Sequence, residues 1–118
     1  MAACVLLSGM LVFHSWAGER YIVRRLLRRD NLPKLFGADT FTKRTIRYAW
    51  HLLTVVGAGL AAILAYAAAR PTPAPVLHVV AATLALGAIW GLAATRARHL
   101  SWILLAATAA LTEWAALG

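Results

Sequence analysis

The segment 48–69, with the sequence YAWHLLTVVGAGLAAILAYAAA, decides the fold class. It carries no Asp, Glu, Lys or Arg, and it is as long as the roughly 20 mostly apolar residues that a helix needs to cross a bilayer. Three further apolar stretches have a comparable length, and they cover 2–18, 76–94 and 99–117. The prolines of the RPTPAP sequence separate the second stretch from the third, because proline cannot continue a helix. The chain is therefore predicted to be a single all-α integral membrane domain over 1–118, with four spans.

The composition supports this class. Of the 118 residues, 62% are hydrophobic and 14% are charged, whereas soluble domains average about half and about a quarter. These values exclude an ordinary water-soluble domain and a disordered chain. The one cysteine, Cys4, excludes a disulfide-rich module.

Basic residues predict how the spans are oriented. Eleven of the 12 Lys and Arg residues fall in the segments 19–47 and 95–98, and only Arg70 falls in the connector between the second and third spans. Positive charge gathers on the cytoplasmic side of membrane proteins. We therefore expect a multi-pass protein of a bacterial inner membrane, with a cytoplasmic loop over 19–47 and both termini outside. The net charge of +8 is then explained by basic residues on the cytoplasmic side of the membrane, and nucleic acid is not expected as a partner.

The start of the cytoplasmic loop, ERYIVRRLLRRDN, alternates apolar and basic residues at helical spacing. This pattern predicts a basic amphipathic helix that lies in the membrane interface. Arg24, Arg25, Arg28 and Arg29 are its expected contacts with anionic lipid headgroups.

Alanine and glycine, rather than leucine, dominate the spans. Small residues let helices approach closely in lipid, so we expect a compact four-helix transmembrane bundle. Small residues also lie on more than one helix face, which favours a homo-oligomer or a place in a larger membrane complex.

Ionisable residues within membrane spans are functional candidates. His14, His51 and His99 share one depth, near the cytoplasmic ends of three helices. Imidazole binds haem iron and transition metals, so b-type haem or a metal ion is one possible ligand of this layer. A purely structural layer and a proton or substrate relay are the alternatives.

His78 and Glu113 share the opposite depth, where a lone carboxylate would be costly. We expect them to be hydrogen-bonding partners, either to fix the helix register or to carry a proton.

No phosphate-binding, nucleophile-elbow or zinc-protease motif is present. The sequence therefore favours a small non-enzymatic membrane protein, an oligomeric or accessory subunit with a cytoplasmic histidine layer. A haem- or metal-binding protein and an oligomeric small-solute or proton-coupled transporter are the two alternatives.

Overall fold

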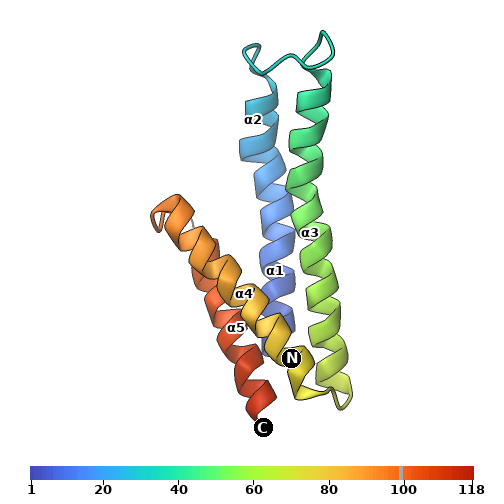
Figure 1. Cartoon of the computed structure of the whole chain (residues 1–118), viewed down its shortest axis with the longest axis vertical. Coiled ribbons are helices and arrows are strands. Elements are labelled where there is room, and N and C mark those ends of the chain that lie inside the picture. Colours follow the sequence, from blue (N-terminus) through green and yellow to red (C-terminus); the bar gives the residue numbers. More distant parts are fainter. Residues whose placement is uncertain (99) are drawn as a thin grey trace.

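The computed structural model describes residues 1–98 and 100–118, and the described residues form helices without any β-strand. Figure 1 shows the arrangement. The elements are α1 (Ala2–Ala17), the π-helical turn η1 (Gly18–Val23), α2 (Arg24–Leu27), α3 (Thr40–Ala69), α4 (Ala74–Thr95) and α5 (Ser101–Leu117). Three helical stretches are long and apolar enough to cross a membrane, namely Ala2–Leu27, Thr40–Ala69 and Ala74–Thr95, and Ser101–Leu117 is a shorter apolar helix.

The expected amphipathic helix is not a separate element. The first helix continues through η1 into α2, and α2 extends along the axis of α1 (Figure 1). The segment is not separate from the first helix because nothing between Ala17 and Leu27 breaks the chain. Pro33 is the first residue that cannot continue a helix.

The helix ends otherwise follow the signals in the sequence. Helix α3 begins after Asp39, whose carboxylate lies 2.7 Å from the Lys43 ammonium one turn later. Helix α4 begins just after Pro73. It ends at Thr95, and the next two residues, Arg96 and Ala97, both adopt left-handed backbone angles. Helix α5 begins at Ser101, two residues later than the expected start of the fourth span, and residue 99 lies outside the described residues.

The helices form two antiparallel hairpins rather than one compact bundle. Helices α1 and α3 form the first, α4 and α5 form the second, and the second leans against α1 at an angle (Figure 1). The shared apolar core lies toward the end that holds both termini, and it includes Leu7, Leu64, Leu77 and Val80. The radius of gyration is 16.7 Å, whereas a compact domain of this length has about 13 Å. The expectation of compactness is wrong because α3 and α4 pack little against each other.

Two glycines permit the close approach of α1 and α3. A Cβ atom on Gly18 would overlap the indole ring of Trp50, and one on Gly57 would overlap the side chain of Leu11. The Trp50 ring is stacked against the His14 ring, with centroids 4.7 Å apart and an interplanar angle of 4°. Trp50 cannot move away from Gly18 without losing this stacking, whereas the Leu11 side chain is more flexible.

We predict that Gly18→Ala destabilises the protein by about 1–3 kcal/mol, the cost of overpacking a well-filled contact. Gly59 is the matched control, because it lies in α3 and a Cβ there would meet nothing within 4 Å. Gly59→Ala should leave stability unchanged or raise it by up to about 1 kcal/mol, the helix propensity difference. Thermal unfolding of both variants in detergent, followed by circular dichroism, measures the difference. A Gly18→Ala variant as stable as Gly59→Ala would show that this approach is not tight.

Candidate functional site: a polar cluster between the first and third helices

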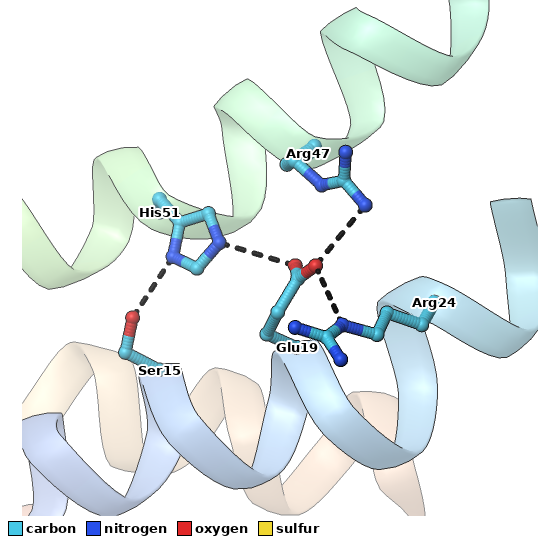
Figure 2. Close-up of polar contacts among 5 residues, drawn as sticks. All are labelled: Ser15, Glu19, Arg24, Arg47 and His51. Atoms are coloured by element: carbon cyan, nitrogen blue, oxygen red, sulfur yellow. Dashed lines mark hydrogen bonds and ion pairs between the residues drawn. The ribbon is translucent and has the colours of Figure 1, made fainter.

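Polar side chains from α1, η1, α2 and α3 meet at the basic end of the first hairpin (Figure 2). The Ser15 hydroxyl lies 2.8 Å from Nδ1 of His51, and Nε2 of His51 lies 3.3 Å from a Glu19 carboxylate oxygen. The other Glu19 oxygen lies 3.0 Å from Nη2 of Arg47 and 3.4 Å from Nε of Arg24. Glu19 is thus the carboxylate on which two arginines and a histidine converge.

The spacing along each helix creates this cluster. Ser15 and Glu19 are four residues apart on the first helix, and Arg47 and His51 are four residues apart on α3. Residues at this spacing share one helix face. Because the two helices run antiparallel, Ser15 comes opposite His51 and Glu19 comes opposite Arg47. The π-helical turn begins at Gly18, so Glu19 is presented by a segment that departs from regular α-helical geometry.

The charges of the cluster explain why it holds together. Glu19 is the only acidic residue between Met1 and Arg29, a segment that carries five arginines. Its side chain is 21% exposed, whereas those of Arg24 and Arg47 are 60% and 50% exposed. A charged acceptor held in a partly desolvated position forms stronger hydrogen bonds than a neutral one. The carboxylate therefore ties α3 to the first helix and neutralises part of the dense positive charge.

The expected histidine layer is divided between separate contacts. His14 stacks on Trp50, and both ring nitrogens of His51 are engaged by Ser15 and Glu19. His99 lies outside the described residues. Among the residues that the structure describes, no three His, Cys, Asp or Glu side chains form a group that could hold a metal ion.

The order Ser15–His51–Glu19 also resembles the hydrogen-bond chain of a serine hydrolase. Such enzymes need, in addition, free backbone N–H groups that stabilise the oxyanion of the intermediate. Ser15 lies within helix α1, where backbone N–H groups are already bonded along the helix. This arrangement can join two helices and pass a proton between them, and within the described residues the backbone N–H groups of α1 beside the hydroxyl are used by the helix itself.

At the opposite end, the structure brings His78 and Glu113 together as their shared depth predicts. Nδ1 of His78 lies 3.0 Å from both carboxylate oxygens of Glu113, so the pair joins α4 to α5. Their side chains are 42% and 45% exposed, and both line a shallow groove between these two helices.

The four arginines expected to contact lipid headgroups all lie on the exposed surface of α2 or just after it. Arg24 is also bound to Glu19. Arg25 belongs to α2, which continues along the axis of α1, and Arg28 and Arg29 follow directly after α2.

No known protein family, curated protein or solved structure is detectably similar to this chain. The description of the site therefore depends on the chemistry of its own residues.

Reasoning from depth alone did not identify Ser15, Glu19 and Arg47. Glu19 is one residue beyond the expected first span and Arg47 is one residue before the second, so both belong to the expected loop. A usable signal is present nevertheless, because a serine–glutamate pair and an arginine–histidine pair occur at matching four-residue spacing on neighbouring helices.

We predict that Glu19→Gln lowers the free energy of unfolding by about 1–2 kcal/mol. Hydrogen bonds to charged groups contribute about 1.5–3 kcal/mol, and the exposure of both arginines reduces this value. Asp39→Asn is the charge-matched control. It removes one partly exposed ion pair with Lys43 at the start of α3, and pairs at this four-residue spacing contribute about 0.3–0.5 kcal/mol.

A double-mutant cycle with Glu19→Gln and Arg47→Gln isolates the coupling between the two helices. A favourable coupling energy is expected. Strictly additive effects of the two substitutions would mean that the contact between Glu19 and Arg47 contributes nothing to stability.

Proposed function

We propose that this chain is a small non-enzymatic membrane protein that acts as a subunit of an oligomer or of a larger membrane complex. Its apolar surface supports the location. The accessible surface is 8,219 Å², whereas a compact soluble monomer of this mass exposes about 6,200 Å². Much of the excess is apolar, since Val12, Phe13, Leu53, Val55 and Leu86 are each more than half exposed.

One observation carries the non-enzymatic part of the proposal. At the basic end, the candidate reactive side chains bond to each other across the α1–α3 interface, and Glu19 is bonded to three of them. Side chains that are bonded to each other in this way hold the two helices in register. This arrangement favours the structural role of the histidine layer.

The proposed orientation follows from charge. The basic end of the first hairpin faces the cytoplasm of a bacterial cell, and both termini lie on the outer side of the inner membrane. The anionic lipids of the inner leaflet are then the nearest partners for Arg24, Arg25, Arg28 and Arg29.

This orientation predicts the behaviour of reporter fusions in living cells. Alkaline phosphatase fused after Gly118 should be active, because it would reach the outer compartment, and green fluorescent protein fused there should be dark. The same reporters inserted at Gly37, in the loop before α3, should give the reverse pattern. The opposite result at both positions would invert the proposed topology.

Specific contacts support each of the two alternative functions, ligand binding and transport. His14 and His51 lie at the same end of the first hairpin, which supports haem or metal binding, although a metal on His51 would have to displace Ser15 or Glu19. The His78–Glu113 pair beside an open groove supports proton-coupled transport by an oligomer.

Purified protein distinguishes these functions in one set of measurements. We expect a colourless, metal-free protein that is more than a monomer in lipid nanodiscs and conducts no protons in liposomes. A Soret band or one metal ion per chain that His51→Ala abolishes would establish the ligand-binding alternative. A proton flux that Glu113→Gln abolishes would establish transport instead.

A further inference from the structure

We propose that the face of the α4–α5 hairpin that carries His78 and Glu113 is the surface on which two copies of this chain pack. The inference deepens the proposed function, since it depends on self-association and names the surface responsible. The ion pair and its surroundings carry the argument.

The surface is a groove of about 640 Å³ between α4 and α5. All of its lining residues come from these two helices, so the first hairpin does not cover it. Seven of the lining residues are alanines, and His78 and Glu113 lie among them. Alanine walls bring the groove floor close to the helix backbones, so another helix can pack closely against it.

The His78–Glu113 pair makes contact between this surface and lipid tails unfavourable. His78 lies in the second turn of α4 and Glu113 lies near the C-terminal end of α5, both at the end opposite the basic loop, and nearly half of each side chain is exposed. Contact with lipid tails leaves the remaining hydrogen-bonding capacity of both groups unused, which is unfavourable in an apolar surrounding. A protein surface with its own donors and acceptors removes this cost.

A second copy supplies these groups at the correct depth. Two copies with the same orientation in one membrane are related by a two-fold axis along the membrane normal. Such an axis presents each surface to itself and leaves the depth of every residue unchanged, so His78 of one copy and Glu113 of the other lie at the depth that these residues share within one chain. The histidine of each copy then lies near the carboxylate of the other, so the four side chains can bond to one another.

The shape of the hairpin is also self-complementary. Val79, Leu86 and Ile89 of α4 are 66%, 67% and 62% exposed, and they form a ridge of branched side chains beside the alanine groove. A ridge next to a groove allows each copy to insert its ridge into the groove of the other, which is how helices commonly pack.

Cysteine cross-linking tests the surface directly. In a background with Cys4→Ala, we introduce Ala82→Cys, which lies in the groove and is exposed. Ala62→Cys is the matched control, because it is exposed at a similar depth in an alanine-lined groove between α1 and α3. Oxidation with copper phenanthroline in native membranes should link Ala82→Cys into a dimer several-fold more than Ala62→Cys. Equal or weaker linkage at position 82 would overturn the proposed surface.

A second measurement tests the ion pair without relying on cysteines. The dimer association constant of the wild-type chain in liposomes, measured by energy transfer between labelled copies during lipid dilution, should fall about three- to tenfold in Glu113→Gln. This range corresponds to the loss of hydrogen bonds within a membrane. An unchanged constant would overturn the role of the pair.

The outcomes separate this inference from the proposed function. A wild-type dimer without preferential linkage at position 82 means that self-association is correct and the surface is wrong. A chain that stays monomeric at every lipid dilution overturns the inference and leaves only a larger complex with other proteins for the proposed function.

Discussion

The contact between Gly18 and the indole ring of Trp50 sets the geometry of the first hairpin. Because Gly18 has no side chain, α3 lies close enough for Trp50 to fit between the glycine and the His14 ring. That register places Glu19 within reach of Arg47 and His51. A shift of one residue along either helix would turn these side chains to different faces, so the polar cluster depends on the apolar contact next to it.

The sequence predicts the parts of the structure that depend on local chemistry. Hydropathy and the prolines at 71, 73 and 75 place most helix ends to within a few residues, although α3 begins at Thr40, eight residues before the expected span, and matching depth predicts that His78 meets Glu113. The continuous first helix and the Glu19 cluster depend on tertiary contacts instead. The basic face of 20–29 fits an in-plane helix as well as an axial one. The packing of Gly18 and Val23, both buried, favours the axial form, and no periodicity in the sequence encodes that packing.

The two hairpins are held by different means. The first combines a tight glycine contact with a charged cluster, and the second combines alanine packing with a single ion pair. They touch chiefly through α1 and α5, near the end that holds both termini. One face of the second hairpin consequently has no cover from the same chain, and the ion pair lies on that face. A polar pair at such a position is more typical of a surface that packs against another protein than of a surface that faces lipid.

The axial course of α2 also changes the role of the basic residues. The molecule is 55 Å long, whereas a bilayer with its headgroups is about 40–45 Å thick. At 1.5 Å per residue, Arg28 lies roughly 15 Å beyond the level of Gly18 and Trp50, which exceeds the screening length of about 8 Å at physiological salt. Arg24 and Arg47, which lie closer to that level, share the Glu19 carboxylate. In the proposed orientation, the arginines nearest that level are thus partly neutralised by Glu19 within the protein. In that orientation, the summed positive charge of this end determines how the chain is oriented, whichever lipid headgroup each arginine contacts.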